Sequence, residues 1–369
     1  ETAEENARYR ELFPQYFNLA TVPFYWCDLE PEQGKPRYAA DSPKIYRRPA
    51  PDLCLEYCNE KNILAKLHCL FYERWIPDWL PKDNEAEMIR LYEKRFKEIS
   101  KRYADELYEV EVLNELLLEQ NWTGQSVLSK RRDVIEWAFA LARKYFPHNT
   151  LVFNEAGNTP QLGKEDYRSA FFMMLDAALL RGAEIDKIGV QNHIHCGARC
   201  PIEEDVYNYA RYFDPVLQWE GLKTLSVFGK PLEITEITIP CLGEGADGEE
   251  IQAELLRYLY TLWFAVPQME TVVYWNTIED TGFHSTTVQW NENNCRGGLL
   301  RRDFSEKPAG RVLRELFTKE WHTDLELTTD ENGCVSFRGF YGDYTAKAGG
   351  AISAFGLHKH ESEKIEVQL

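Results

Sequence analysis

Two glutamates close apolar segments of this chain and are the residues best suited to chemistry. Glu115 ends the segment VEVLNE at 110–115, and Glu236 ends LEITE at 232–236. Two carboxyl groups that face each other across a pocket can hydrolyse a glycosidic bond, because one protonates the leaving oxygen while the other attacks the sugar or activates water. A single glutamate at a strand end is more commonly a solvated side chain, so the hypothesis of an acid pair depends on both residues together.

Further polar and aromatic side chains follow other apolar segments. The carboxyl ends of barrel strands meet at one shared pocket, so residues at these ends are the candidates for a common site. Beside the two glutamates, the sequence places His68, Asn114, Gln191, His193 and Trp275 at such ends.

Strands and helices alternate along most of the chain. Seven short segments rich in β-formers end near Pro23, Phe71, Glu115, Asn154, Gln191, Glu236 and Trp275. Helical periodicity lies between them at about 87–103, 131–146, 165–181, 203–218, 249–264 and 306–319. Strands that alternate with helices form a parallel sheet, and units of roughly 40 residues in this number predict an α/β (β/α)₈ barrel. Because residues 7–16 have a helical pattern that leads into the first recognisable strand, we expect the first barrel strand to lie upstream of Glu1 or to be missing from the chain.

A change of pattern near residue 321 predicts a second, smaller domain. Leu325, Leu327, Val335 and Phe337 alternate on either side of the turn sequence 330–333, and glycines punctuate the following residues. The sequence therefore predicts a catalytic barrel over 1–321 and a small β-strand module over 322–369, packed on the barrel.

Composition excludes several classes of function. The 369 residues include 42 Lys and Arg against 60 Asp and Glu, which gives a net charge of −18 and argues against a nucleic-acid or anionic-membrane partner. No apolar run reaches the roughly 18 residues that a membrane span needs, and no signal peptide is recognisable at the start of the given chain. Nine cysteines are an odd number, so a dense disulfide scaffold is not expected.

The strand-end motifs resemble those of glycoside hydrolase family 10. The likeness runs in order over about residues 8–318, and the Asn-Glu, Gln-x-His and Thr-Glu motifs together form a specific set. The segments that carry it are FNLAT at 17–21, LHCLFYERWIPDWL at 67–80, VLNELL at 112–117, LVFNEAGN at 151–158, IGVQNH at 188–193, LEITEI at 232–237 and VYWNTIED at 273–280.

This resemblance implies a retaining, endo-acting β-glycosidase, typically a β-1,4-xylanase, that forms a covalent glycosyl-enzyme and needs no metal or organic cofactor. Glu115 would be the acid/base and Glu236 the nucleophile. Family members are commonly secreted, periplasmic or on the cell surface, and their partner is a polysaccharide or oligosaccharide substrate. The remaining roles implied are a sugar 2-hydroxyl contact for Asn114, positioning of the acid/base for Gln191, support of the nucleophile for His193, a sugar hydroxyl contact for His68 and the floor under the sugar for Trp275.

The sequence departs from the family pattern on the side that binds the glycone. Val22 and Tyr25 stand where the family has Asn and Lys, and Tyr72-Glu73 replaces a Trp-His pair. An apolar Val cannot bond a sugar hydroxyl, whereas Tyr25 and Tyr72 offer aromatic faces for substrate binding. We therefore expect weak cleavage of unbranched xylan and better turnover of a decorated or shorter β-glycoside, unless a neighbour such as Glu73 replaces the lost contacts.

A second departure affects the histidine beside the nucleophile. Thr238 stands where the family has Asp, so His193 loses the carboxylate that would orient it.

Two alternatives stay open at this stage. The altered positions would also fit a carbohydrate-binding pseudoenzyme with little turnover. A metal-dependent hydrolase could use the cluster of His193, His195, Cys196 and Cys200, although this spacing matches no zinc site we can justify.

Overall fold

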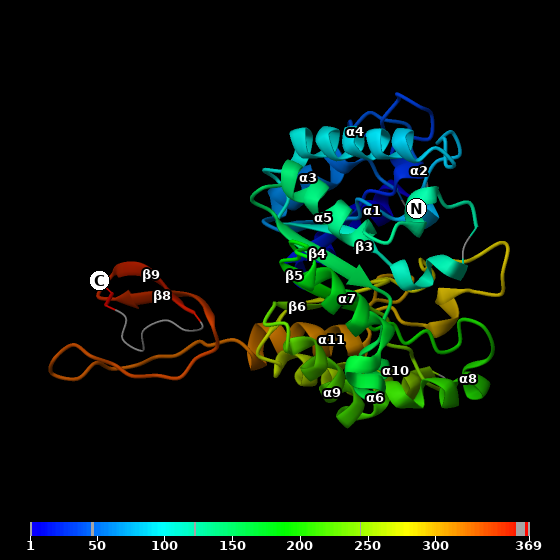
Figure 1. The fold of residues 1–369 in the computed structure, drawn as a ribbon. Coiled ribbons are helices and arrows are strands. Elements are labelled where there is room, and N and C mark those ends of the chain that lie inside the picture. Colours follow the sequence, from blue (N-terminus) through cyan, green and yellow to red (C-terminus); the bar gives the residue numbers. More distant parts are fainter. Residues whose placement is uncertain (1, 46–47, 122, 244, 359–365, 368–369) are drawn as a thin grey trace. The chain divides into compact units, whose positions relative to one another are not determined.

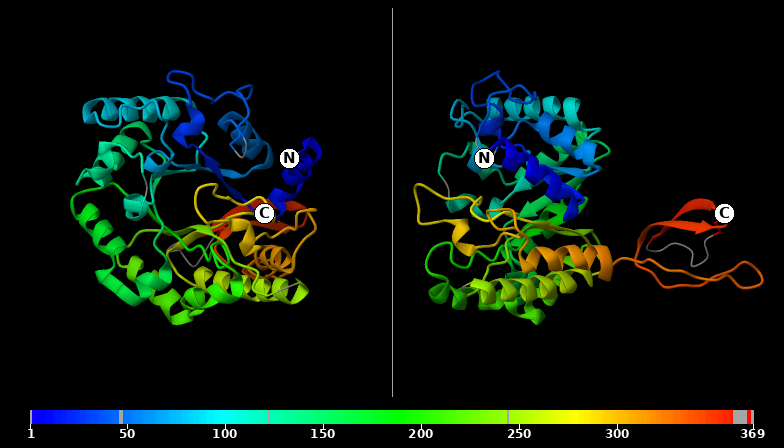
Figure 2. Two further views of the ribbon diagram at one scale, coloured as in Figure 1. Left: turned by 90° about the vertical axis from the view of Figure 1, so that its right-hand side faces the viewer. Right: turned by 180° about the vertical axis from the view of Figure 1, so that it is seen from behind.

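Seven parallel strands form one curved sheet in the computed structural model of the chain. Their order in the sheet follows the order in the sequence, and helices cover the outside of the ring they make (Figures 1 and 2). This arrangement confirms the predicted α/β barrel. The strands are β1 (Leu19–Pro23), β2 (Leu64–His68), β3 (Glu109–Asn114), β4 (Thr150–Glu155), β5 (Lys187–Gln191), β6 (Leu232–Ile237) and β7 (Met269–Tyr274).

Helices connect the strands. The longer ones bury one apolar face against the sheet, as α4 does with Met88, Tyr92, Phe96 and Ile99. No helix in the described part of the chain is long and apolar enough to cross a membrane. The α-helices are α1 (Ala3–Leu12), α2 (Trp26–Leu29), α3 (Pro51–Lys61), α4 (Glu85–Tyr103), α5 (Val134–Tyr145), α6 (Thr159–Glu165), α7 (Ala170–Leu180), α8 (Ile202–Tyr209), α9 (Pro215–Ser226), α10 (Gly245–Phe264) and α11 (Pro308–Glu315).

Short 3₁₀ segments and one π-helical segment complete the helical structure. The 3₁₀ segments are η1 (Phe13–Gln15), η2 (Glu73–Trp75), η3 (Leu116–Asn121), η4 (Val127–Lys130), η5 (Asp166–Arg168), η6 (Ala210–Phe213) and η7 (Glu292–Cys295), and the π-helix is η8 (Leu316–Glu320).

Two of the predicted helices are each interrupted and form two separate helical segments. The segment 203–218 is broken at Asp214, whose carboxylate accepts hydrogen bonds from Val216 and Leu217 and so caps α9, with Pro215 as its first residue. A proline disfavours helical geometry at the residue before it, which explains the break. The segment 165–181 is likewise divided, because Ser169 caps a new helix, α7.

An isolated parallel β-bridge lies beyond the end of β7. Leu300 pairs in parallel with Ile278, and both pack with Leu12 just ahead of β1. Tyr16 adds a hydrogen bond of 2.7 Å from its hydroxyl to Glu306. Residues near 300 thus pair beyond the end of β7 and pack against the segment that precedes β1, while the strand expected upstream of Glu1 stays a prediction.

Buried ion pairs fill part of the barrel interior. Lys66 on β2 contacts Glu233 on β6 at 2.6 Å and Glu111 on β3 at 2.7 Å. β2 and β6 are not neighbours in the sheet, so these side chains meet across the interior. Lys187 on β5 and Glu109 on β3 form a similar pair at 2.8 Å.

The chain divides into two units, residues 1–310 and 311–369. The structure describes residues 2–45, 48–121, 123–243, 245–358 and 366–367. The predicted domain boundary at 321/322 and the packing of the module on the barrel stay predictions.

The described part of the second unit contains one antiparallel hairpin. Strands β8 (Gly342–Ala348) and β9 (Ala351–Leu357) pair along their full length and are joined by Gly349 and Gly350, as the glycine pattern predicts. The strands predicted around 325–327 and 335–337 are wrong, because these residues form no ladder. The turn between them does form, with Gly333 donating to the Asp330 carbonyl at 3.0 Å.

Candidate active site

Gln191 joins the two glutamates that the sequence singled out. Its Nε2 donates to Oε1 of Glu115 and to Oε1 of Glu236, each at 2.9 Å. The two acceptor oxygens can therefore be no further apart than twice this distance. The three residues come from the ends of β3, β5 and β6, and Gln191 lies opposite Glu236 in the register of the sheet. The predicted acid pair is thus brought together at one end of the barrel.

The backbone at Glu115 turns out of β3 in a left-handed conformation. Its φ is +56°, which is uncommon for a residue other than glycine, and its N–H donates to the Asn154 carbonyl at 3.1 Å. Tyr72 donates its hydroxyl hydrogen to the second carboxyl oxygen. Burial and the negative charge of Glu236 raise the pKa of Glu115, while the hydrogen bonds from Tyr72 and Gln191 partly offset that rise. A raised pKa keeps a carboxyl protonated and able to act as an acid.

Glu236 is nearly buried and has partners on both oxygens. Besides Gln191, Asn154 donates to Oε1 at 3.0 Å, and the His193 ring lies 3.0 Å from Oε2 through its Nε2. The other ring nitrogen of His193 lies 3.0 Å from the Thr238 hydroxyl. Thr238 therefore occupies the place from which a carboxylate would orient the ring, as the sequence predicts.

Two asparagines connect these groups, and one of them was not predicted. Asn154 Nδ2 also donates to Oδ1 of Asn114 at 2.8 Å and to Glu111 at 3.2 Å, while its Oδ1 accepts from Thr235 at 2.6 Å. Asn114 is buried within this network. Asn154 is the end residue of a predicted strand, which is the signal that could have added it to the candidates.

His68 is tied into the buried ions below the acid pair. Its Nδ1 contacts Glu111, which in turn pairs with Lys66, and its Nε2 lies 3.1 Å from the Tyr25 hydroxyl. Burial opposes charge on the ring, but the Glu111 carboxylate outweighs it and the pKa of His68 is raised. Burial would raise the pKa of Glu111, yet Lys66 and His68 lower it to about 2.

Trp275 lies between the histidines at the end of β7. Its ring centre is 5.7 Å from that of His193 and 6.4 Å from that of His68, in both cases edge to face. Its Nε1 donates to Glu292 at 3.3 Å. The half-exposed indole therefore borders the same site as the acid pair, where the sequence placed it.

An aromatic cluster forms the flank of the site at the ends of β1 and β2. Tyr25 is 8% exposed, and its ring centre lies 6.1 Å from that of Tyr72 and 5.9 Å from that of Trp75. The Arg48 guanidinium covers the Tyr25 ring at 4.5 Å. Val22 is buried beside this flank. The Tyr25 hydroxyl thus contacts His68, and neighbouring side chains cover much of its ring.

Two further glutamates near the site are fully buried. Glu73 accepts hydrogen bonds from the Tyr92 hydroxyl at 2.6 Å and from the Ser126 N–H at 2.5 Å, so its carboxylate is occupied away from the acid pair. The sequence did not single out Glu155. It accepts from the N–H groups of Leu117 at 3.1 Å and Ala156 at 2.8 Å, and burial raises its pKa to about 8.

The side chains of the histidine and cysteine cluster, residues 193–200, do not converge to form a metal-binding site. His195 stacks on His193 with ring centres 4.3 Å apart, and burial followed by the charges of His193 and Arg199 lowers its pKa. Within the described residues, no three His, Cys, Asp or Glu side chains are placed to hold a metal ion. All nine cysteines are free thiols.

The chain is similar in sequence to xylanases and to one regulatory protein. It is 24% identical to Endo-1,4-beta-xylanase 1 of Arabidopsis thaliana over 98% of this chain and 34% of that protein. It is also 24% identical to Anti-sigma-I factor RsgI6 of Acetivibrio thermocellus over 92% of this chain and 39% of that protein. The chain thus spans only about a third to two fifths of the length of these relatives.

Solved structures and a family model agree with the fold. Xylanase 10B from Thermotoga petrophila, solved in complex with xylobiose, superposes with a TM-score of 0.66 at 18% identity, covering 87% of this chain and 90% of that one. Native xylanase 10B from Thermotoga maritima gives the same TM-score of 0.66 at 17% identity, with 86% of this chain and 92% of that one covered. The model of glycosyl hydrolase family 10 matches residues 2–315, so the chain belongs to this family.

Proposed function

We propose that the chain is a retaining glycoside hydrolase that cleaves β-1,4-linked polysaccharide or oligosaccharide of the xylan type. The observation that supports this most directly is Gln191, which bonds one oxygen of Glu115 and one of Glu236 at 2.9 Å each. The shared donor limits the distance between these two oxygens to at most twice 2.9 Å, and short carboxyl separations are typical of the retaining mechanism. A polysaccharide substrate also fits the secreted, periplasmic or cell-surface location that the family resemblance implies.

The proposed roles follow from the surroundings of the two acids. Glu236 attacks the anomeric carbon and forms a covalent glycosyl-enzyme, because hydrogen bonds from Asn154 and Gln191 hold its carboxyl group in place. Glu115 protonates the leaving oxygen, because burial and the charge of Glu236 raise its pKa. In the second step, Glu115 takes a proton from the water that releases the sugar.

The aromatic flank supports an altered substrate preference. His68 already contacts Glu111 and Tyr25 with its two ring nitrogens, so a sugar hydroxyl must compete for it. Val22 offers no hydrogen bond at all. We therefore propose that unbranched xylan is a poor substrate and that a decorated or shorter β-glycoside is turned over faster. Comparison of kcat/KM on unbranched and decorated xylo-oligosaccharides tests this directly, and about 10⁴ M⁻¹s⁻¹ or more on the unbranched set with no gain from decoration would contradict it.

Two substitutions test the proposed roles through the leaving group. Glu236→Ala removes the nucleophile and should lower turnover by roughly 10⁴-fold or more on every substrate. Glu115→Ala should lower kcat/KM by about 10²–10⁴-fold on unactivated oligosaccharides but by less than about tenfold on a dinitrophenyl β-xyloside, whose leaving group needs no proton.

Glu254→Ala is the matched control, because Glu254 is an exposed glutamate on α10, away from the site. Equal losses for both active-site variants on the activated substrate would contradict the assigned roles. The comparisons with known proteins give no support to a pseudoenzyme, and activity that neither substitution changes would remove the acid pair from the mechanism altogether.

A further inference from the structure

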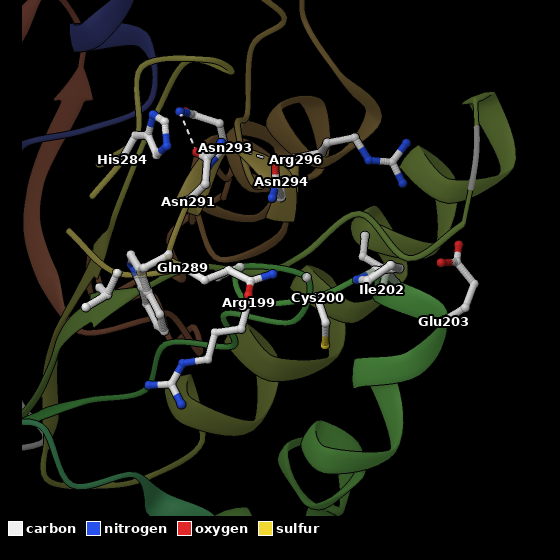
Figure 3. A pocket seen from close by; sticks show the side chains of 15 residues that line it. Arg199, Cys200, Ile202, Glu203, His284, Gln289, Asn291, Asn293, Asn294 and Arg296 are labelled. Atoms are coloured by element: carbon white, nitrogen blue, oxygen red, sulfur yellow. Dashed lines mark hydrogen bonds between the residues drawn. The ribbon is translucent and has the colours of Figure 1, made fainter. Parts of the chain in front are cut away.

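A cavity of about 700 Å³ opens at the end of the barrel that carries the acid pair. Two loops line it, residues 197–203 after β5 and residues 284–296 between β7 and α11. Figure 3 shows side chains of the second loop, including His284 and Asn291, on one side of the space and Arg199 and Cys200 on the other. Asn291 donates its N–H to the Ala198 carbonyl at 2.9 Å, which fixes the two loops to each other.

Ring contacts connect this cavity to the proposed nucleophile. Trp290 in its lining lies edge to face on His195, with ring centres 4.9 Å apart. His195 stacks on His193, and His193 contacts Glu236 at 3.0 Å. Two ring contacts thus separate the lining of the cavity from the histidine that contacts Glu236.

The polar groups of the lining suit a carbohydrate. Asn291 and Asn293 bond each other at 3.0 Å, and Asn293 also accepts from the Gly282 N–H at 2.7 Å, so the loop is internally braced. Gln289 is exposed, and its amide makes no hydrogen bond to another described residue. A braced loop that presents an unused amide next to an indole offers both a donor and an acceptor for sugar hydroxyls.

The charge of the lining is positive, although the chain carries a net charge of −18. Two arginines and one glutamate, Glu203, line the cavity. Arg296 donates to the carbonyl oxygens of Cys241 and Gly243 rather than to a carboxylate, so its charge is not neutralised. Arg199 is exposed, forms no ion pair with any described residue, and lies over the Trp290 ring at 5.0 Å.

The exposed guanidinium of Arg199 is therefore available to bind an anion. The cation–π contact with Trp290 restrains this side chain, and the N–H groups of a guanidinium suit a planar, two-oxygen acceptor. Carboxylates match this fork geometry, and a carboxylate attached to a sugar would bring hydroxyls to Gln289 at the same time.

We propose that this cavity binds an acidic carbohydrate unit, a hexuronic acid carried as a branch on the saccharide chain, with its carboxylate on Arg199. The inference rests on the proposed function for the nature of the chain that carries the branch. It specifies which decoration the site prefers, and it assigns the preference to two loops that lie outside the acid pair.

Three probes with the same backbone test this proposal. They are an unbranched xylo-oligosaccharide, the same oligosaccharide with one glucuronic acid branch, and the branched compound after its carboxylate has been reduced to an alcohol. Titration calorimetry with the Glu236→Ala protein measures binding without turnover, and kcat/KM is measured with the wild-type protein. We expect the acidic branch to bind about tenfold more tightly than the reduced branch, since a hydrogen-bonded charge contributes about that much.

Arg199→Gln should reduce this preference to about twofold or less, with little change for the unbranched compound. Arg132→Gln is the matched control, because Arg132 is likewise exposed and has no ion pair among the described residues. The preference of the wild-type site should also weaken as salt is added.

The outcomes separate this inference from the proposed function. Equal binding of the acidic and reduced branches, or a preference that survives Arg199→Gln, would overturn the inference. If none of the three compounds is hydrolysed by the wild-type protein while the acidic preference persists and depends on Arg199, the proposed function fails and the acidic site stands.

Discussion

Two sides of the same pocket differ in how their polar groups are used. At the ends of β3 to β6, amides and carboxylates bond one another, with Gln191 and Asn154 both donating to Glu236. At the ends of β1 and β2, aromatic rings pack together and the Tyr25 hydroxyl contacts His68. The first side gathers two carboxyl groups with their amide donors, whereas the second presents mainly aromatic rings. Under the proposed function, reaction type and substrate preference are therefore set by separate parts of this barrel.

Gln191→Leu should give the largest separation of the two sides. The leucine has a similar size but cannot donate to Glu115 and Glu236, so both carboxylates lose a hydrogen bond and their relative position. We expect kcat to fall by about 10²–10³-fold on all substrates, as for the loss of other preorganised donors. Steady-state kinetics on aryl and oligosaccharide substrates measures this, with thermal unfolding as the control for folding. A loss below about fivefold would contradict the role of Gln191.

Tyr25→Phe should act on substrate preference instead. The ring stays in its cluster, but His68 Nε2 loses its partner at 3.1 Å and becomes available to a sugar hydroxyl. One such hydrogen bond corresponds to about 1 kcal/mol, so kcat/KM on unbranched xylo-oligosaccharides should rise about fivefold relative to decorated ones. A uniform fall on both sets would show instead that Tyr25 serves the reaction itself, and the contrast between the two sides would be lost.

Tyr72→Phe should give the smallest effect on rate. Tyr72 belongs to both sides of the pocket, because its hydroxyl bonds Glu115 while its ring packs near Tyr25. Its hydroxyl donates to Glu115 and favours the ionised carboxylate, so its removal should raise the pKa of Glu115 further. The acid must be protonated to act, so the upper limb of the pH profile of kcat/KM should move to higher pH. At the optimum we expect a change of about threefold or less. A limb that stays in place or moves to lower pH would contradict this assignment.

Much of the fold and the acid pair could be predicted because both depend on local signals. Seven strand ends follow apolar segments, several are closed by a polar residue, and the carboxyl ends of parallel barrel strands share one end of the barrel. Glu115, Gln191 and Glu236 were found in this way, and the structure joins them. The glycine pair at 349–350 likewise predicts the hairpin of β8 and β9.

Other features depend on contacts between distant segments. Nothing local in the sequence indicates that Glu155 lies buried against the turn after Glu115, or that Tyr25 bonds His68. Leu325 and Val335 alternate as strand residues do, but the pairing that a strand needs does not form there. Asp214-Pro215 is a local signal for a helix break, but the prediction followed the helical periodicity of the apolar residues and missed it.

The anomeric configuration of the first product tests the central claim most directly. Glu115 and Glu236 share the amide of Gln191 as a hydrogen-bond donor, and with Glu236 as the proposed nucleophile the account predicts retention through a covalent intermediate. Proton NMR during hydrolysis of a β-xylo-oligosaccharide should therefore show the β-anomer first, with the α-anomer appearing later by mutarotation. An α-anomer as the first product would mean inversion and would contradict the account.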